Sequence, residues 1–358
     1  MRITYLGPLP PHHGGVAQHG AKLTAALVTA GHAVQRLSWG SPYPARFYPG
    51  DLVDPSTSPS KNVRYALDWY RPHSWFRGGR AARLGDALVM PWVTTVHGPA
   101  TAIARAAAGD TPAVAIVHNA LPHERHPFDA LLTSVALRRF DAAVVHAATV
   151  AEVVQELAPW LPVEIISHPP NLSLTAAPLP PTPPLRVLIF GFVRAYKGVE
   201  LGLDALERLR RRGMDVEMTI AGRFWEPLSR WQEEIDARNL RDHVVLDDRY
   251  IPDGAVGSLF GAHHLVLAPY RSATQSGIVP LAQAAGRPVV ATNVGGLVEA
   301  VDDGRTGRLA DPTGGALADA IADVAADLER YAAASGAATP RWSQVADVLI
   351  ELVTRLRG

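Results

Sequence analysis

The sequence contains no cysteine, no excess of either charge and no long apolar run. The absence of cysteine excludes disulfides and thiolate metal ligands. The 34 Lys and Arg residues are balanced by 34 Asp and Glu residues, which gives a formal net charge of zero. This balance argues against a nucleic-acid partner and a strongly polybasic membrane anchor, because both rely on clustered basic residues.

The apolar runs are all much shorter than the roughly 20 residues that a membrane-spanning helix needs. Residues 1–7 are typical of a short strand, and they lack the apolar stretch and the small-residue cleavage site of a signal peptide. We therefore expect a cytoplasmic protein.

A proline-rich segment divides the chain of 358 residues, a length that suits two domains. Five prolines occur within residues 178–184, where neither a helix nor a central strand can continue. This pattern predicts a first domain over 1–177, a stiff linker over 178–185 and a second domain over 186–340. Residues 341–358 are expected to form an amphipathic helix that is able to pack back on the first domain.

Short apolar strands alternate with helices in both halves. The expected strands are 3–6, 87–89, 113–117, 142–145 and 163–166, then 187–190, 216–220, 244–246, 264–268 and 288–292. Helices are expected over 16–30 and 201–212. This alternation predicts an α/β protein with two doubly wound Rossmann-like domains. Ligands of such sheets bind beyond the carboxyl ends of the strands, which favours a site in a cleft where the two domains face each other.

A turn with two cations follows the strand 187–190. It reads Gly-Phe-Val-Arg-Ala-Tyr-Lys-Gly over residues 191–198 and contains Arg194 and Lys197. An arginine fork and a lysine point charge at a strand-to-helix turn suit a bound anion. The alternative is that both are solvated loop residues, as most Lys and Arg side chains are.

A second turn, over residues 269–277, follows the strand 264–268. Its last four residues are Thr274, Gln275, Ser276 and Gly277. Small and hydroxyl residues at the start of a helix leave backbone N–H groups available for a phosphate. Simple helix capping by Thr274 or Ser276 is the alternative, and the two uses are compatible.

Six motifs in order give the second half a family resemblance. After the Arg-x-x-Lys-Gly turn come Ala221-Gly222, Pro269-Tyr270, the Gly-x-Pro-Val-Val of 286–290, the Gly-Gly-Leu-x-Glu of 295–299 and the Asp-Gly-x-Thr-Gly of 303–307. Together they resemble the retaining glycosyltransferases of family 4, a group 1 family with the GT-B fold. The resemblance extends more loosely to the first half through Gly14-Gly15 and the strand end at His118.

This resemblance implies roles for particular residues. Arg194 and Lys197 would neutralise the donor diphosphate as it leaves, and His118 would contact the transferred sugar. The backbone of Gly14 and Gly15 would approach the donor where a side chain could not fit.

The remaining donor contacts are implied in the same way. The backbone of Thr274, Gln275, Ser276 and Gly277 would bind the diphosphate. Glu299 would support the loop or reach the ribose. No Asp-x-Asp metal motif is present. The resemblance implies a metal-independent hexosyl transfer from a nucleotide sugar, with no cofactor. The family's mechanism retains the anomeric configuration of the transferred sugar. In it a donor phosphate oxygen takes the acceptor proton, so no protein base would be needed.

The sequence departs from the family at two acidic positions. The family carries two glutamates that are separated by seven intervening residues and bind hydroxyls of the donor sugar and the ribose. At these positions this chain has Ala273 and Leu281. Gln275 and Gln283 keep the mutual spacing but lie two residues later, so a shifted contact remains open. An active subfamily and a non-catalytic sugar-nucleotide-binding relative are therefore both retained as hypotheses.

Two further patterns have less specific meanings. The pairs His12-His13 and His123-x-x-His126 lack a convincing third ligand, so no metal site is predicted. Residues 68–77 mix aromatics with cations and suit either inward packing or a peripheral contact with the inner face of a membrane. The acceptor, whether a small molecule, a glycan or a lipid-linked sugar, is not determined by the sequence, and neither are the nucleotide base and the donor sugar.

Overall fold

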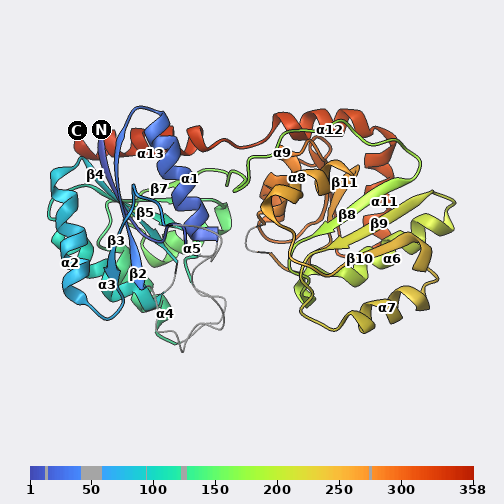
Figure 1. Cartoon of the computed structure of the whole chain (residues 1–358), viewed down its shortest axis with the longest axis horizontal. Helices are drawn as coiled ribbons and strands as arrows, with labels where there is room; N and C mark the ends of the chain where they lie inside the picture. The colour runs from blue at the N-terminus through green and yellow to red at the C-terminus, as the bar shows by residue number, and fades with distance from the viewer. Residues whose placement is uncertain (13–14, 42–58, 94, 122–126, 274–275) are drawn as a thin grey trace. The chain divides into compact units, whose positions relative to one another are not determined.

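The computed structural model describes residues 1–12, 15–41, 59–93, 95–121, 127–273 and 276–358 (Figure 1). The chain divides into two compact units. Unit 1 comprises Met1–Ser167 and Arg341–Gly358, and unit 2 comprises His168–Pro340. Each unit is built on one parallel sheet.

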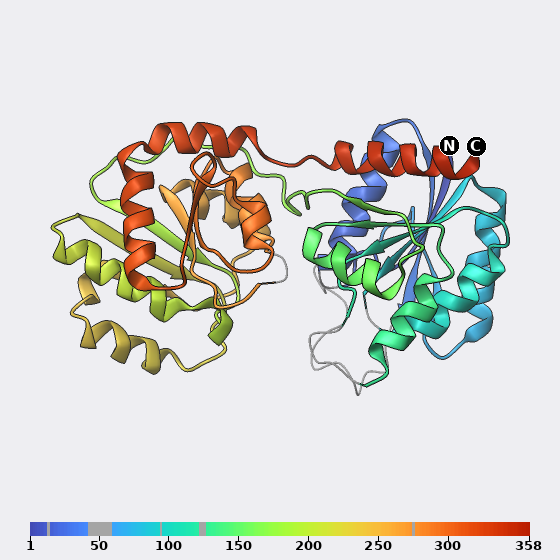
Figure 2. The ribbon, with the colours of Figure 1, turned by 180° about the vertical axis from the view of Figure 1, so that it is seen from behind.

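The sheet of unit 1 has the strand order β3-β2-β1-β4-β5-β6-β7. Its strands are β1 (Arg2–Leu6), β2 (Ala33–Ser41), β3 (Arg64–Asp68), β4 (Ala87–Trp92), β5 (Ala113–Val117), β6 (Ala142–Val145) and β7 (Val163–Ile165). The helices are α1 (Gly15–Thr29), α2 (Pro72–Ala81), α3 (Gly98–Ala107), α4 (Asp129–Leu137), α5 (Ala148–Leu157) and α13 (Trp342–Arg357). They lie on both faces of the sheet (Figures 1 and 2).

Alternate residues of each central strand of unit 1 enter different hydrophobic cores. In β4, Leu88 and Met90 belong to one core, whereas Ala87 and Val89 belong to the other. A strand that is buried on both faces needs apolar side chains at successive positions, which explains its continuous apolar sequence. Unit 1 is therefore doubly wound.

The C-terminal helix α13 belongs to unit 1. Its apolar residues Val345 and Leu349 pack in the same core as Leu23 and Leu27 of α1. The two helices lie side by side in both views, red against blue (Figures 1 and 2). The apolar spacing of α13, at every third or fourth residue, supplies one buried face, and the opposite face carries charged side chains.

The sheet of unit 2 has the strand order β10-β9-β8-β11-β12-β13. Its strands are β8 (Leu185–Phe190), β9 (Val216–Ala221), β10 (Val244–Asp247), β11 (Leu265–Ala268), β12 (Val289–Thr292) and β13 (Gly307–Ala310). The helices are α6 (Val199–Arg211), α7 (Leu228–Ala237), α8 (Asp253–Gly261), α9 (Ile278–Ala284), α10 (Leu297–Ala300), α11 (Gly314–Ala326) and α12 (Leu328–Ala337). Val187 and Ile189 of β8 enter one core and Leu188 enters the other, so unit 2 is doubly wound as well.

The proline-rich segment lies within unit 2, where the buried side chain of Arg287 holds it. The Arg287 guanidinium is 0% exposed and donates to the carbonyl oxygens of Ala177 and Pro178, each at 2.8 Å. It also donates to the carbonyl of Phe260 at 3.1 Å and to that of Gly261 at 3.1 Å. These carbonyls satisfy a buried cation without a carboxylate partner.

The predicted α/β class with two doubly wound Rossmann-like units is confirmed. Three strands of the described chain were not predicted, namely β2, β3 and β13. None of them is buried along its whole length: β2 and β3 include exposed positions, and three of the four residues of β13 are half-buried. β3 and β13 are edge strands, and β2 is next to an edge. Such strands lack the continuous apolar run that marks a central parallel strand.

Candidate functional site

The cationic turn of unit 2 lies directly beyond the carboxyl end of β8. A short 3-10 helix over Ala195–Lys197 leads from this turn into α6. Gly198 joins the two helices with a φ of +61°, and a Cβ at this position would lie 2.0 Å from the carbonyl oxygen of Pro269. The turn is thus pressed against the loop that follows β11, and Arg271 N donates to Tyr196 O at 2.7 Å across the same contact.

The Lys197 side chain is buried at the centre of this contact. It is 7% exposed, its Nζ lies 4.1 Å from the centre of the Tyr270 ring, and it donates a hydrogen bond to the Tyr270 hydroxyl. Burial lowers the pKa of the Lys197 ammonium from 10.5 to about 8. No ion pair to Lys197 occurs among the described residues. Because buried charges are usually paired with an opposite charge, Lys197 makes this turn a candidate anion site.

Tyr270 completes a short polar chain towards the second turn. Burial raises the pKa of its phenol to about 12, and a hydrogen bond with the Ser276 side chain acts in the opposite direction. Tyr270 therefore stays neutral and is able to accept the Lys197 hydrogen bond. Thr274 and Gln275, which were predicted to bind the diphosphate, lie outside the described residues.

Arg194 is exposed and stacks on an aromatic ring from the neighbouring loop. Its Cζ lies 4.2 Å from the centre of the Trp225 ring, which follows β9 and is 70% exposed. Two main-chain hydrogen bonds join the loops, from Val193 N to Arg223 O at 2.8 Å and from Trp225 N to Val193 O at 2.9 Å. The indole therefore fixes one face of the guanidinium and leaves its edge available for an anion.

The glycine pair of 295–296 packs against the same region. Gly295 has a φ of +48°, and a Cβ on it would lie 1.7 Å from Ala273 O. Gly296 N donates to that oxygen at 3.1 Å. Gly277 caps α9, whose first residue Ile278 lies beside the β8 turn. The structure thus brings together Arg194, Lys197, Ser276 and Gly277, with Glu299 exposed on the adjoining helix α10.

The two positions that depart from the family have structural uses. The backbone oxygen of Ala273 accepts the hydrogen bond from Gly296 N, and Leu281 packs against the core of unit 2. Gln283 is buried, and its amide donates to Ala300 O at 3.1 Å. Gln283 is therefore a core residue that joins α9 to α10, while Gln275 lies outside the described residues.

In unit 1, the loop after β1 leads to the predicted glycine turn. His12 is buried, and its Nε2 lies 2.5 Å from Trp39 O. Gly14 lies outside the described residues. Gly15 begins α1.

His118 follows β5 and joins a buried cluster of three histidines. Its ring centre lies 4.6 Å from that of His19 on α1, with the rings perpendicular. The Nε2 atoms of His19 and His146 are 2.7 Å apart, and His146 Nδ1 contacts Ile166 O at 2.8 Å. The Trp342 ring of α13 packs on His19 at 4.8 Å. This cluster holds His118 at the carboxyl edge of the unit 1 sheet.

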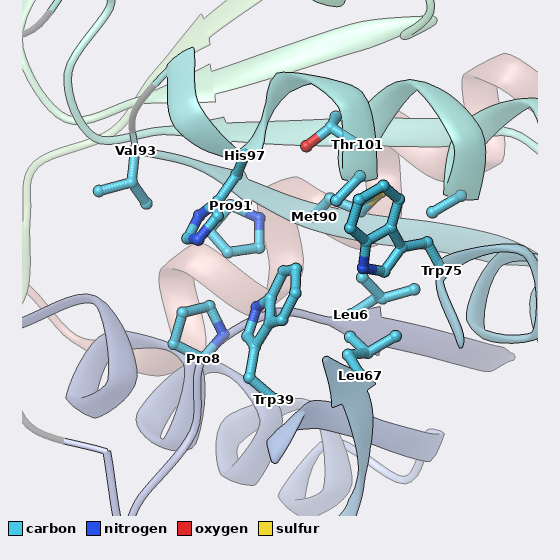
Figure 3. Close-up of a pocket in the computed structure, with 13 residues that line it drawn as sticks. Leu6, Pro8, Trp39, Leu67, Trp75, Met90, Pro91, Val93, His97 and Thr101 are labelled. Carbon is cyan, nitrogen blue, oxygen red and sulfur yellow. The ribbon is translucent and has the colours of Figure 1, made fainter. Parts of the chain in front are cut away.

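A small pocket lies at the same edge of unit 1, between strands β1, β2 and β4 and helix α3 (Figure 3). It is lined by Leu6, Gly7, Pro8, Trp39, Leu67, Trp75, Met90, Pro91, Val93, His97, Ala100, Thr101 and Ala104. The space within it is about 20 Å³, which suffices for about one water molecule.

The described residues give no support to a metal site or a membrane span. Across them, no group of three or more His, Asp or Glu side chains is arranged to hold a metal ion. Asp248 accepts from Phe224 N at 3.0 Å, and Asp247 pairs with Arg249 at 2.7 Å. None of the described helices has both the length and the apolarity needed to cross a bilayer. His123 and His126 lie outside the described residues.

Trp225, His19 and His146 are site residues that the sequence did not indicate. Trp225 lies three residues after the Ala221-Gly222 motif, and His19 lies four residues beyond Gly15, but neither position has a spacing that predicts a contact with Arg194 or His118. Tyr270 was recognised as part of a motif, without its contact to Lys197. Each of these contacts joins residues that are distant in sequence.

Unit 2 thus combines a doubly wound sheet with a buried lysine in the turn beyond β8. Residues 184–327 match the family model of the glycosyl transferases group 1. Unit 2 is therefore a group 1 glycosyltransferase domain, which confirms the resemblance at this level. Membership of family 4 stays a prediction.

Curated relatives are glycosyltransferases by name. The chain is 34% identical over 176 residues to the D-inositol 3-phosphate glycosyltransferase of Paenarthrobacter aurescens, a match that covers 46% of this chain and 42% of the relative. It is 28% identical over 340 residues to the glycogen synthase of Mycobacterium tuberculosis, covering 82% and 78% respectively. The match to the first of these relatives thus spans less than half of that protein's length.

Solved structures share the fold over almost the whole chain. The sucrose-phosphate synthase of Thermosynechococcus elongatus has a TM-score of 0.72 at 17% identity and covers 99% of both chains. The Anabaena protein Alr3699/HepE, solved in complex with UDP, has a TM-score of 0.70 at 17% identity and covers 99% of this chain and 100% of its own. At this identity the likeness concerns the fold, and it confirms the GT-B class.

Proposed function

We propose that the chain transfers a sugar from a nucleoside-diphosphate donor to an acceptor hydroxyl, with retention of configuration and without a metal ion. The observation that carries this proposal is the buried Lys197, which has a neutral hydrogen-bond partner in Tyr270. A diphosphate supplies the missing negative charge. The names of the relatives and the UDP in the Anabaena structure support the same donor class.

The chemistry follows from where charge develops. Breaking the sugar–phosphate bond leaves additional negative charge on the diphosphate, and a preorganised cation stabilises it most in a site that excludes water. Lys197 provides such a charge from a buried position, and Arg194, held by Trp225, provides a fork of donors from the exposed side. The N–H groups near Ser276 and Gly277 add neutral donors. Each donor of this kind contributes about 3 kcal/mol to transition-state stabilisation in comparable enzymes.

The roles of the remaining residues are part of the same proposal. His118 contacts the transferred sugar, with His19 and His146 holding its ring. Gly14 and Gly15 admit the donor, and Glu299 supports the glycine turn or reaches the ribose. A donor phosphate oxygen takes the acceptor proton, so no protein base is required. A cytoplasmic location and a peripheral membrane contact through residues 68–77 stay predictions. In that segment Trp69, Tyr70 and Phe76 are exposed.

The experiment is a donor screen followed by a turnover assay. UDP-, GDP-, ADP- and dTDP-sugars are tested for thermal stabilisation of the full chain, because a ligand that binds only the folded state raises its melting temperature. The best donor is then assayed for sugar release and transfer, with and without EDTA, and the product anomer is read by NMR. We expect activity that resists EDTA and a retained anomer.

Variants make the assay specific. Lys197→Ala is expected to lower kcat/KM by at least a hundredfold. Arg212→Ala, at the opposite end of α6 and paired with Asp319 at 2.6 Å, serves as the control and keeps full activity. Stabilisation by a donor without any turnover would favour the non-catalytic alternative, and stabilisation by no donor would contradict both.

A further inference from the structure

Helix α4 carries apolar side chains on the side that faces away from the core of unit 1. These side chains are between 45% and 68% exposed, and they belong to Phe128, Leu131, Leu132 and Val135. Each is three or four residues from another, so together they form one stripe along the helix, here called the α4 stripe. Ala136 and Leu137, on the inward side, belong to the core of unit 1. Figure 1 shows α4 at the lower margin of this unit.

The α4 stripe is not interrupted by a charged side chain. The one charged residue of α4 is Asp129, which is buried and accepts a hydrogen bond from Thr95 Oγ1 at 2.8 Å. Val96, the residue after Thr95, is exposed as well. The exposed side of α13, by contrast, carries the charged residues Asp347 and Glu351, as is usual for a helix at a protein surface. A continuous exposed apolar surface marks a contact with a partner or a membrane.

Two arginines lie at the end of the α4 stripe. Arg138 and Arg139 are exposed, and they follow the last apolar member of the stripe by three and four residues, which places them on the same side. Within the described part of the chain neither forms an ion pair, and the nearby Asp141 is paired with Arg105 at 3.2 Å. The Arg138 Cζ lies 5.0 Å from the centre of the exposed Trp160 ring. Apolar side chains, an indole and unpaired cations are the composition of a helix that lies in a membrane interface.

The charges decide which partner fits the α4 stripe. Two copies of the chain that paired through it would add cations to cations, because the stripe has no exposed carboxylate. An anionic lipid surface supplies headgroups for Arg138 and Arg139 and acyl chains for the apolar side chains. The long arginine stems allow their charged ends to reach the headgroups while the helix side is buried.

We propose that the α4 stripe, with Arg138 and Arg139, docks unit 1 on the surface of an anionic phospholipid membrane. This inference assigns the predicted membrane contact to α4 and not to residues 68–77. It rests on the proposed function in one respect, because the docked chain would transfer its sugar to an acceptor at the membrane surface. The docking itself requires no donor and no turnover.

The test measures co-sedimentation of the full chain with lipid vesicles, without donor or acceptor. Vesicles of phosphatidylcholine alone are compared with vesicles of phosphatidylcholine and phosphatidylglycerol in a two-to-one ratio. Binding to the anionic vesicles should be tighter by about tenfold or more, because each arginine near such a surface adds to the affinity. Added salt should weaken this binding, since it screens the headgroup charge. Equal binding to both kinds of vesicle, or to neither, would overturn the proposal.

Two double variants locate the contact. Leu131→Ser combined with Leu132→Ser should weaken vesicle binding by about tenfold, because membrane affinity scales with the apolar area that is buried. Arg138→Gln combined with Arg139→Gln should remove the preference for anionic lipid. The matched control is Leu84→Ser, which changes an exposed leucine of unit 1 outside α4 and should bind like the wild type. Thermal unfolding shows that each variant is folded.

Three results would contradict the assignment to α4. Both double variants could bind the anionic vesicles as the wild type does. Trp69→Ser could lose binding in their place, which would locate the contact in residues 68–77. The wild type could sediment as a dimer in solution that the leucine variant converts to a monomer, which would make the α4 stripe an interface between copies of the chain.

Lys197→Ala separates this inference from the proposed function. The variant should lose sugar transfer and bind the vesicles as the wild type does, because Lys197 lies in unit 2. A wild type that transfers sugar but binds no vesicle would refute the docking alone. A wild type that binds anionic vesicles through α4 but transfers no sugar would refute the proposed function alone.

Discussion

The Lys197 ammonium donates a hydrogen bond to the Tyr270 hydroxyl, and its nitrogen lies 4.1 Å from the centre of the tyrosine ring. The two residues are 73 positions apart in the chain. Their contact joins the turn after β8 to the loop after β11, at the edge of the sheet where the donor is proposed to bind. Both the stability of the chain and its affinity for a donor should therefore depend on this contact and on the residues around it.

Lys197 is expected to lower the stability of the folded chain at neutral pH. Its pKa is about 8 in the folded chain, compared with 10.5 for a lysine that is fully hydrated, as in the unfolded chain. The unfolded chain therefore binds more protons between these values, and stability rises with pH across this window. At pH 7 the burial of the Lys197 charge lowers the free energy of unfolding by about 3 kcal/mol. Replacing Lys197 removes this penalty but also removes the hydrogen bond to Tyr270, which stabilises the folded chain by about 1 kcal/mol.

Lys197→Met should thus raise the free energy of unfolding at pH 7 by about 2 kcal/mol and abolish donor turnover. Urea unfolding at pH 7 and pH 10.5 measures this, and the advantage of the variant should disappear at the higher pH. A variant that is less stable than the wild type at pH 7 would refute the proposed burial penalty.

Tyr270→Phe should weaken donor binding by about tenfold, which corresponds to one hydrogen bond to a charged group. Loss of the hydroxyl oxygen, which accepts a hydrogen bond from the ammonium, should lower the pKa of Lys197 further. Because the donor diphosphate binds the protonated lysine, donor affinity should decline at a lower pH than in the wild type. Titration with the best-stabilising nucleotide between pH 6.5 and pH 9 measures both effects. Tyr331→Phe, whose hydroxyl donates to Asp323 at 2.9 Å, is the control. An unchanged pH midpoint in Tyr270→Phe would exclude this role.

Trp225→Ala should weaken donor binding two- to fivefold, because an exposed cation–π contact contributes about 0.5–1 kcal/mol. The indole holds the Arg194 guanidinium 4.2 Å from its centre. Trp160→Ala in unit 1 is a matched control, since Arg138 lies 5.0 Å above that ring and no site residue is nearby in sequence. Equal effects of the two substitutions on donor affinity would show that Trp225 does not position Arg194.

Gly198→Ala should destabilise the chain by at least 2 kcal/mol and reduce donor binding. A Cβ would lie 2.0 Å from Pro269 O, so the turn that carries Lys197 has to move away from Tyr270. Gly213→Ala is the control, because its φ of +81° is equally left-handed but a Cβ there meets nothing within 4 Å. The control should lose only about 1 kcal/mol. Similar losses in both variants would mean that the close approach to Pro269 is unimportant.

The central strands of the fold were predictable because they are buried on both faces. The strands Ala113–Val117 and Ala142–Val145 have the bounds that the apolar runs predict, and each is buried at every position. β2 was missed because its burial pattern includes exposed positions and its residues alternate in polarity. The edge strand β3 was missed for the same reason.

The sequence by itself determined the α/β class, the positions of the central strands and the cationic turn with Arg194 and Lys197, because each depends on residues that are close together in the chain. Only the tertiary structure decided that Lys197 is buried against Tyr270, that Trp225 stacks on Arg194 and that His19 and His146 surround His118. Those contacts join segments that follow different strands, and parallel pairing brings such segments to one edge whatever their separation in sequence. The pKa of Lys197 follows from that packing, since burial is a property of the fold and not of the local residues.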